Sequence, residues 1–155
     1  MAKIETLHDI FDRDVYPADH LMVNPVNCVG VMGAGLAKEF KARYPEIYAP
    51  YKRLCDEKRL HPGMLTTWKV PRVARVIINL PTKIHWKDDS TLDIIDRSLE
   101  ILRYHCAMYV ASCAFNVTVD VPKLGCGLGK LSWDVVRPRI IEAFKNIDCT
   151  LGISD

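Results

Sequence analysis

Short apolar runs alternate along the chain with longer segments whose apolar residues recur every three or four positions. The run Ala74–Leu80 is rich in β-branched residues and almost entirely apolar, which is typical of a strand buried on both faces near the centre of a sheet. Weaker runs of the same kind predict the other strands, at Lys3–Leu7, Leu21–Val23, Gly63–Val70, Asn116–Val121 and Thr150–Ile153. The pattern thus predicts strands from one end of the chain to the other.

The longer segments predict helices. The apolar residues of Leu92–Cys113 form one stripe at helical spacing. Ser90, with Asp93 three residues later, is close to a capping box and would start this helix. Pro138 lies inside another predicted helix and is expected to bend it, because proline removes one backbone hydrogen bond. That helix spans Trp133–Phe144, and two more are predicted at Ala34–Arg43 and Pro45–Lys58.

Strands and helices that alternate in this way are typical of an α/β fold with a largely parallel sheet. The sequence contains no internal repeat, no low-complexity stretch and no linker. Its 155 residues are also the length of one ordinary domain. We therefore expect residues 1–155 to form a single domain.

Composition excludes several classes of protein. Hydrophobic residues make up 49% of the chain and charged residues 26%, which are values of a globular protein rather than a disordered one. A net charge of +2 argues against a broad electrostatic nucleic-acid binder, although it leaves room for a small basic patch. No apolar run is long enough to span a membrane, and the first residues do not resemble a signal peptide. We expect a cytoplasmic protein that does not bind membranes.

The cysteines and histidines give no sign of a metal site. The six cysteines are scattered and form no CxxC pair, and the histidines have no metal-ligand spacing. We therefore expect the thiols to be reduced and the protein to bind no metal ion and no cofactor. A monomer is the default expectation for the oligomeric state.

Candidate chemistry lies in two glycine clusters, which hold six of the eight glycines. They occupy residues 24–35 (NPVNCVGVMGAG) and 122–130 (PKLGCGLGK), and each follows a predicted strand. Glycine-rich turns expose successive N–H groups that bind anions, and in open α/β sheets such loops form the ligand site. A pyrophosphate is the obvious candidate ligand. The alternative is that these glycines only form tight turns. Neither cluster fits the Walker or GxGxxG pattern.

Several motifs together resemble a known family. The segments His8-Asp9-Ile10-Phe11, NCVGVMGAGLAKEFK, NLPTKIHW and PKLGCGLGKLSW occur in order across almost the whole chain. They resemble the macro domains, which are ADP-ribose-binding α/β modules, and most closely the DarG branch, whose members remove ADP-ribose from DNA. The terminal ADP-ribose protein glycohydrolase is similar more distantly. The resemblance implies a three-layer sandwich, with helices on both faces of a mixed, largely parallel sheet.

The resemblance also implies ADP-ribose as the ligand and suggests which residues bind it. Asp9 would accept a hydrogen bond from the adenine amino group, with the Ile10 amide beside it. The first loop would surround the distal ribose and the phosphates, through Asn24, Asn27, Val31, Met32, Gly33, Ala34, Gly35 and Leu36. The second loop would hold the pyrophosphate, through Gly125, Cys126, Gly127, Leu128 and Gly129.

Lys83 matches the lysine of the PTK motif, which is the catalytic residue of the DarG branch. Its amine could attack the anomeric carbon of the ribose and release the attached base, leaving a Schiff-base-type adduct that water clears. Attack needs the neutral amine, which partial burial or the positive end of a helix would favour. Without the motif, a surface lysine after a strand would be the preferred interpretation.

The residues that follow Lys83 are candidate substrate contacts. His85 and Trp86 could meet a nucleobase or ADP-ribosylated single-stranded DNA, and Trp86 could stack on a base; the alternative for Trp86 is a half-buried packing aromatic. Basic residues nearby in the sequence could contact phosphates or could form a solvated face; they are Lys69, Arg72, Arg75 and Lys87.

Three departures from the pattern keep alternatives open. Ala34 stands where DarG proteins commonly carry lysine, and Gly129 stands where the terminal ADP-ribose glycohydrolase carries a catalytic aspartate. The chain also stops at residue 155, whereas DarG proteins usually continue into a second domain. The leading hypothesis is a hydrolase that frees ADP-ribose from a modified DNA base. The alternatives are hydrolysis of ADP-ribose-1″-phosphate, O-acetyl-ADP-ribose or ADP-ribosylated protein, and a reader of ADP-ribose without turnover.

Overall fold

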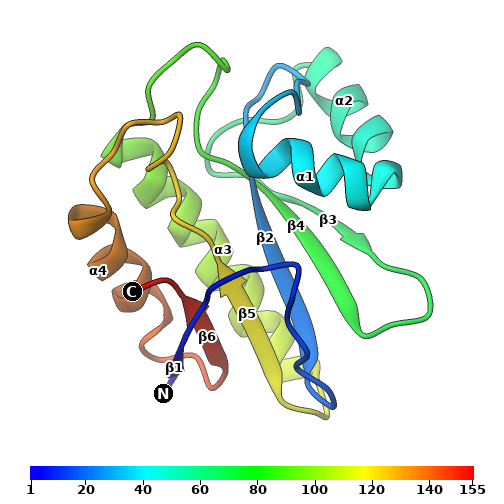
Figure 1. Cartoon of the computed structure of the whole chain (residues 1–155), viewed down its shortest axis with the longest axis vertical. Helices are drawn as coiled ribbons and strands as arrows, with labels where there is room; N and C mark the ends of the chain where they lie inside the picture. Colours follow the sequence, from blue (N-terminus) through cyan, green and yellow to red (C-terminus); the bar gives the residue numbers. More distant parts are fainter.

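A computed structural model describes all residues, 1–155, and contains one six-stranded sheet (Figure 1). The strands lie in the order β1-β6-β5-β2-β4-β3. All neighbouring pairs are parallel except β3 and β4, so the sheet is mixed but largely parallel, as predicted. The strands are β1 (Lys3–Thr6), β2 (Asp19–Val26), β3 (Thr66–Lys69), β4 (Arg75–Pro81), β5 (Val117–Val121) and β6 (Thr150–Ile153).

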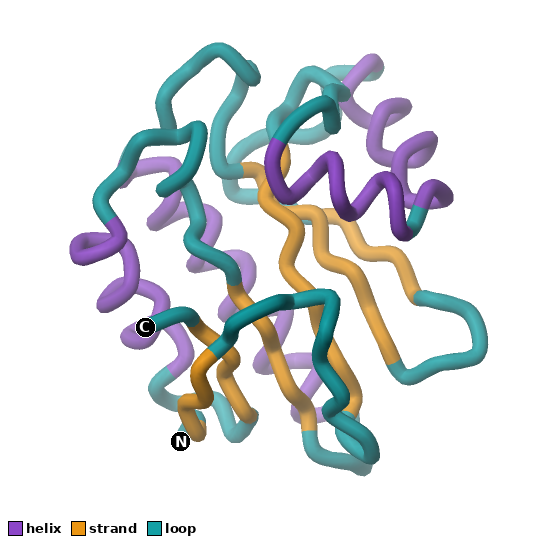
Figure 2. The backbone as a smooth tube through the Cα atoms, viewed as in Figure 1, coloured by secondary structure: helices purple, strands orange, loops and turns teal.

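Helices cover both faces of the sheet and complete the predicted three-layer sandwich (Figure 2). Two short helices, α1 (Gly35–Arg43) and α2 (Tyr48–Asp56), pack on one face through residues such as Phe40 and Tyr51. Two further helices, α3 (Leu92–Ser112) and α4 (Trp133–Phe144), pack on the other. None of these helices combines the length and the apolarity that crossing a membrane requires.

The central strands supply both hydrophobic cores. Ile77 of β4 points into the core beneath α1 and α2, whereas Ile78 points into the core beneath α3 and α4. In β2, Met22 points into the core beneath α1 and α2, and Val23 points into the core beneath α3 and α4. Because successive side chains of a strand point to opposite faces, a strand covered on both sides must be apolar at nearly every position. This requirement explains why Ala74–Leu80 is almost entirely apolar.

Some element boundaries differ from the prediction. Strand β2 begins at Asp19 and ends at Val26, well beyond Leu21–Val23, because its polar residues are also buried in the sheet. The first three residues of the predicted helix Pro45–Lys58 form a 3-10 turn, Pro45–Ile47, and α2 follows and ends at Asp56. The predicted strand Gly63–Val70 is shorter, Thr66–Lys69.

The start of α3 is also corrected. Thr91, not Ser90, is the N-cap, and its Oγ1 accepts a hydrogen bond from the Ile94 N–H at 3.2 Å. The capping-box interpretation of Ser90 and Asp93 is therefore wrong by one residue. Ser90 lies outside the helix, and its hydroxyl takes no part in the cap.

A buried charged network holds the segment between β1 and β2 against the sheet. This segment crosses the face that also carries α1 and α2 (Figure 1). The Arg13 Nε and Nη2 atoms donate to the Asp120 carboxylate, both at 3.1 Å, and His20 Nε2 lies 2.7 Å from the same carboxylate. Asp120 and His20 are buried, so the network compensates the desolvation of a carboxylate in the middle of the sheet.

The connections leave the sheet in opposite directions between β2 and β5. From β2 the chain runs through α1 and α2 toward β3 and β4, whereas from β5 it runs through α4 to β6 on the other face. These two strands are parallel neighbours. The loops that follow them diverge and leave a crevice at the carboxyl edge, where open α/β sheets bind ligands. Both glycine clusters are in these loops.

Candidate functional site

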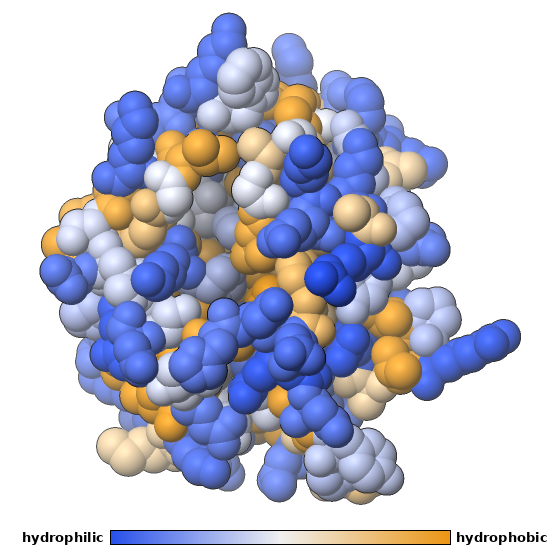
Figure 3. Space-filling model, viewed as in Figure 1, coloured by the Kyte–Doolittle hydropathy of each residue, from blue (hydrophilic) through white to orange (hydrophobic).

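A cavity of about 640 Å³ occupies this crevice. In the space-filling view the surface is hollowed between the loops at the carboxyl edge (Figure 3). The lining comes from the end of β2, from the loops that follow β2, β4 and β5, and from the first turn of α1. It comprises Pro25, Val26, Asn27, Val31, Gly33, Ala34, Gly35, Leu36, Ala37, Thr82, Lys83, Trp86, Ser90, Pro122, Lys123, Gly125, Cys126, Gly127, Leu128 and Gly129.

The charges around the cavity favour an anion. Lys83 and Lys123 are the charged residues of the lining, and no carboxylate belongs to it. The backbone of two glycine-rich turns forms much of the remaining wall. Backbone N–H groups and ammonium groups both attract negative charge, so the site is suited to a phosphorylated ligand.

The first glycine loop is held in shape by the buried side chain of Asn27. Its Oδ1 accepts hydrogen bonds from the backbone N–H groups of Val29 (3.1 Å) and Val31 (3.3 Å). Its Nδ2 donates to the Val31 carbonyl at 2.7 Å, and the Tyr51 hydroxyl lies 2.8 Å from its Oδ1. Asn27 also lines the cavity, but its polar atoms are already used to fold the loop.

This loop leads directly into the N-terminus of α1. The N-cap residue, Ala34, has no side chain that could accept a hydrogen bond from the first turn. The first N–H groups of a helix have no partner within it and form an anion-binding site. Gly35, Leu36 and Ala37, which supply these groups, line the cavity.

The second glycine loop is a tight turn that requires glycine. Gly125 has φ +69°, a conformation that other residues adopt rarely. A Cβ atom at Gly129 would lie 2.4 Å from Ser90 Oγ and 2.5 Å from the Gly125 carbonyl oxygen. The turn is closed by the Leu131 N–H, which donates to the Gly125 carbonyl at 2.9 Å. The glycines here permit close packing of the turn on itself and on Ser90.

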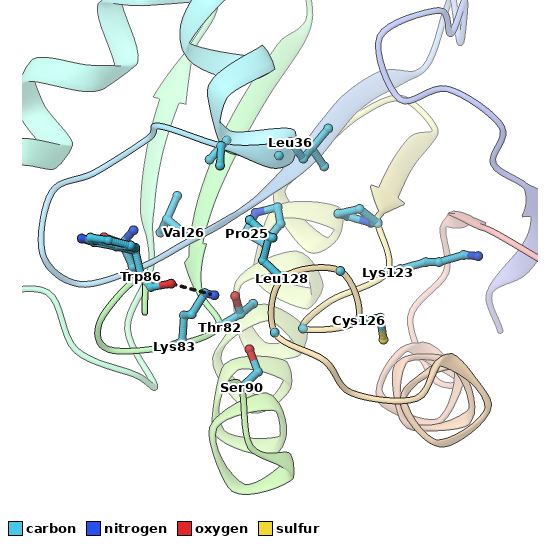
Figure 4. A pocket seen from close by; sticks show the side chains of 18 of the residues that line it. Pro25, Val26, Leu36, Thr82, Lys83, Trp86, Ser90, Lys123, Cys126 and Leu128 are labelled. Carbon is cyan, nitrogen blue, oxygen red and sulfur yellow. Dashed lines mark hydrogen bonds between the residues drawn. The ribbon is translucent and has the colours of Figure 1, made fainter. Parts of the chain in front are cut away.

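The two loops meet across the cavity, with Lys83 between them. A Cβ atom at Gly35 would lie 3.9 Å from Cδ1 of Leu128, which belongs to the second loop. The Lys83 amine lies beside the cavity and donates to the Trp86 carbonyl at 3.3 Å (Figure 4). It also donates to the Asp88 carbonyl at 3.2 Å. The structure therefore brings the predicted lysine and both glycine loops to one cavity.

Trp86 forms part of the rim. Half of its surface (50%) is exposed, its ring lies 5.4 Å from that of His85, and Lys87 Nζ lies 5.1 Å from its centroid. Trp86 lines the cavity, whereas His85 does not. An exposed aromatic face beside a cavity can stack on a nucleobase.

Other predicted contacts do not line this cavity. Ile10 and Met32 are buried in the core beneath α1 and α2, so their side chains point away from it. Asn24 is fully buried and donates to Asn79 Oδ1 at 3.0 Å. Asp9 is exposed on the β1–β2 segment, where its Oδ1 accepts a hydrogen bond from the Phe11 N–H at 2.9 Å.

Three of the four basic residues considered as phosphate contacts are at the wrong end of the sheet. Arg75 begins β4, and Lys69 pairs with Val76 near the same end, with Arg72 in the turn between them. The cavity lies at the opposite end of β4. The sequence placed them near Lys83, but the length of β4 separates them from it.

The sequence did not predict the following lining residues as ligand contacts: Pro25, Val26, Ala37, Thr82, Ser90, Pro122 and Lys123. The positions of Pro122 and Lys123 in the second glycine cluster, and of Thr82 beside Lys83, could have suggested them. Ser90 lacks any such signal, because the six residues 84–89 separate it from Lys83.

Cys126 is the only sulfur-bearing residue of the lining. Its thiol donates to the Leu124 carbonyl at 3.3 Å. Burial raises the pKa of this thiol above its ordinary value, and the charge of Lys123 opposes the shift only in part. The protonated thiol is a weak nucleophile. No three metal-ligating side chains come together anywhere in the chain.

Comparisons with known proteins agree with this fold. The DNA ADP-ribosyl glycohydrolase of Mycobacterium tuberculosis is 38% identical over 138 residues, which cover 86% of this chain and 38% of that protein. The solved macrodomain of Mycobacterium tuberculosis DarG has a TM-score of 0.83 and 34% identity, over 99% of this chain and 98% of that one. Thermosipho africanus DarTG in complex with ADP-ribose has a TM-score of 0.76 and 28% identity, over 86% of this chain and 37% of that one.

The chain thus spans about two fifths of the length of the curated relative, 38%, and nearly all of the solved macrodomain. The family model described as "Macro domain" matches residues 23–140. This match includes the end of β2, all of β4 and β5, and both glycine loops. The chain therefore belongs to the macro domain family.

Proposed function

We propose that this chain binds ADP-ribose and hydrolyses the glycosidic bond between ADP-ribose and a base of DNA. The observation that carries the proposal is the cavity that both glycine loops and Lys83 line together. The relative from Mycobacterium tuberculosis is named a DNA ADP-ribosyl glycohydrolase, and a structural neighbour was solved with ADP-ribose. Both support this choice of ligand and reaction.

Two anion-binding elements of the cavity would hold the diphosphate. One is the turn 125–129, and the other is the uncapped N-terminus of α1 at Gly35. Lys123 adds a positive charge at the same wall. The distal ribose would then lie near Lys83, and the adenosine would extend toward the β1–β2 segment that carries Asp9. The modified base would face the rim at Trp86.

Lys83 supplies the nucleophile in this proposal. Its neutral amine forms a bond to the anomeric carbon of the distal ribose, while the bond from that carbon to the base breaks. The base leaves with the electron pair of that bond. It takes up the proton that the attacking nitrogen releases, since no carboxylate lines the cavity to supply one. The sugar ring then opens to an imine on Lys83, and water hydrolyses the imine to free ADP-ribose and regenerate the amine.

The turn after Lys83 prepares the amine for this reaction. The carbonyls of Trp86 and Asp88 accept hydrogen bonds from Nζ. The turn itself is fixed because the Asp88 N–H donates to the His85 carbonyl at 3.0 Å. An amine held in place loses less freedom in the transition state, so its attack is faster.

Release of ADP-ribose from an ADP-ribosylated single-stranded oligonucleotide tests the proposal. The wild-type protein should release ADP-ribose, and Lys83→Ala should be slower by about a hundredfold or more, because no other group replaces the nucleophile. Lys83→Ala should still bind ADP-ribose. Lys145→Ala is the control, since this exposed lysine at the end of α4 pairs with Glu142 and should leave the rate unchanged.

The same assay separates the alternatives. A protein that binds ADP-ribose but releases none from DNA, protein, the 1″-phosphate or the O-acetyl ester would be a reader. Release from one of the other substrates alone would make it a hydrolase for that linkage. Release by Lys83→Ala at the wild-type rate would refute the lysine mechanism.

A further inference from the structure

Ser90 has a buried hydroxyl group with no partner. The residue is only 4% exposed, and its Oγ makes no hydrogen bond. Ser90 also lines the cavity, at the end of the loop that begins at Lys83 (Figure 4). A buried polar group without a partner is unfavourable and is rare in folded proteins, except where another molecule supplies the partner.

The structure fixes Ser90 against the second glycine loop. Its backbone N–H donates to the Gly129 carbonyl at 3.0 Å. A Cβ atom at Gly125 would lie 3.0 Å from its Cβ, and one at Gly129 would lie 2.4 Å from its Oγ. Two glycines that lack side chains thus make room for this serine. Figure 4 shows its hydroxyl pointing between Thr82 and the turn.

The local fold does not need the Ser90 hydroxyl. Thr91 caps α3, and it is the backbone of Ser90, not its side chain, that bonds to the turn. Ser98, eight residues on, is a contrasting case. It is also fully buried, but its hydroxyl donates to the Pro81 carbonyl. The two serines therefore differ in whether the hydroxyl has a partner within the protein.

We infer that Ser90 is a ligand-binding residue whose hydroxyl donates a hydrogen bond to a diphosphate oxygen. The inference rests on the proposed function for the identity of the ligand. The diphosphate is the part of the ligand assigned to the turn 125–129, to which Ser90 is tied. The N-terminus of α3, which begins two residues later at Leu92, adds a partial positive charge that also favours an anion. The Ser90 hydroxyl and the Lys123 ammonium group would then converge on the same diphosphate.

Titration calorimetry with ADP-ribose and with ADP, together with thermal unfolding, tests this inference. Ser90→Ala should weaken the binding of both ligands by about tenfold or more, as for a lost hydrogen bond to a charged group. Its melting temperature without ligand should equal or exceed that of the wild type, because the removed hydroxyl had no partner. Ser98→Ala should show the opposite pattern: a lower melting temperature and ligand affinities within about twofold of wild type.

Each other result would overturn the inference in a recognisable way. Wild-type affinity of Ser90→Ala for both ligands would refute a role in binding and leave the proposed function intact. A loss for ADP-ribose alone would refute the diphosphate assignment, because ADP lacks only the distal ribose. A lower melting temperature with unchanged affinity would make Ser90 structural. A wild-type protein that binds neither ligand would refute the proposed function, and this inference with it.

Discussion

Replacing Gly129 with alanine should disturb the second glycine loop through two contacts. The added Cβ would lie 2.4 Å from Ser90 Oγ and 2.5 Å from the Gly125 carbonyl oxygen. The serine hydroxyl can rotate away, but the carbonyl is part of the backbone and accepts a hydrogen bond from the Leu131 N–H. The backbone of the turn must therefore move.

The expected magnitude follows from the cost of overpacking. Forcing a methyl group into a well-packed site costs about 1–3 kcal/mol, and for a domain of this size each kcal/mol lowers Tm by about 2–4 °C. Gly129→Ala should therefore lower Tm by roughly 2–12 °C in a calorimetric scan. It should also weaken ADP-ribose binding by roughly tenfold or more, because the N–H groups of the turn would no longer point together at the ligand.

Gly127→Ala is the matched control for stability. It changes the same turn, but a Cβ at Gly127 would have no atom within 4 Å, and its backbone has no positive φ. Its Tm should stay within about 1 °C of the wild type. Equal melting of Gly129→Ala and wild type, or an equal loss for both variants, would refute the packing argument for this turn.

The remaining predictions concern the network, the pH dependence and the cavity thiol. Arg13→Met should lower the free energy of unfolding by about 3–5 kcal/mol in urea titrations, because the buried Asp120 carboxylate loses both hydrogen bonds from the guanidinium group. A loss below about 1 kcal/mol would contradict this. Burial lowers the pKa of His105 from its usual 6.5, so its contribution to stability is present above about pH 6.5 and is lost as pH falls through the folded-state pKa. Unfolding free energies at pH 7 and pH 5 should therefore differ less for His105→Gln than for wild type, and an equal difference would refute this role. Cys126→Ala should keep ADP-ribose affinity within about twofold in calorimetry, since its thiol donates to the Leu124 carbonyl; a tenfold loss would show that the thiol itself contacts the ligand.

Apolar patterning predicted the architecture but not every boundary. Ala74–Leu80 could be recognised as a central strand because both of its faces are covered. The polar ends of β2 could not, since His20 and Asn24 are buried only because partners far along the chain, Asp120 and Asn79, lie beside them. Such pairing depends on the order of the strands, which a local pattern does not contain.

Some residues of the candidate site could likewise be predicted from the sequence, and others could not. The two glycine loops carry a local signature, and the chain topology brings them together with Lys83 at one cavity. Ser90 reaches the same cavity only because the loop after β4 folds back onto Gly129. Lys69 and Arg75 lie close to Lys83 in the sequence and at the other end of β4 in the structure. Proximity along the chain is a poor guide where a strand intervenes.

Trapping the covalent adduct on Lys83 tests the proposed lysine mechanism. The protein would be incubated with an ADP-ribosylated single-stranded oligonucleotide and sodium cyanoborohydride, which reduces an imine to a stable amine, and then digested for peptide mass spectrometry. An ADP-ribosyl adduct should form on Lys83, and it should be absent from Lys83→Ala and from samples without the reductant. Release of ADP-ribose with no adduct at this lysine, or with the adduct on another residue, would contradict the lysine mechanism.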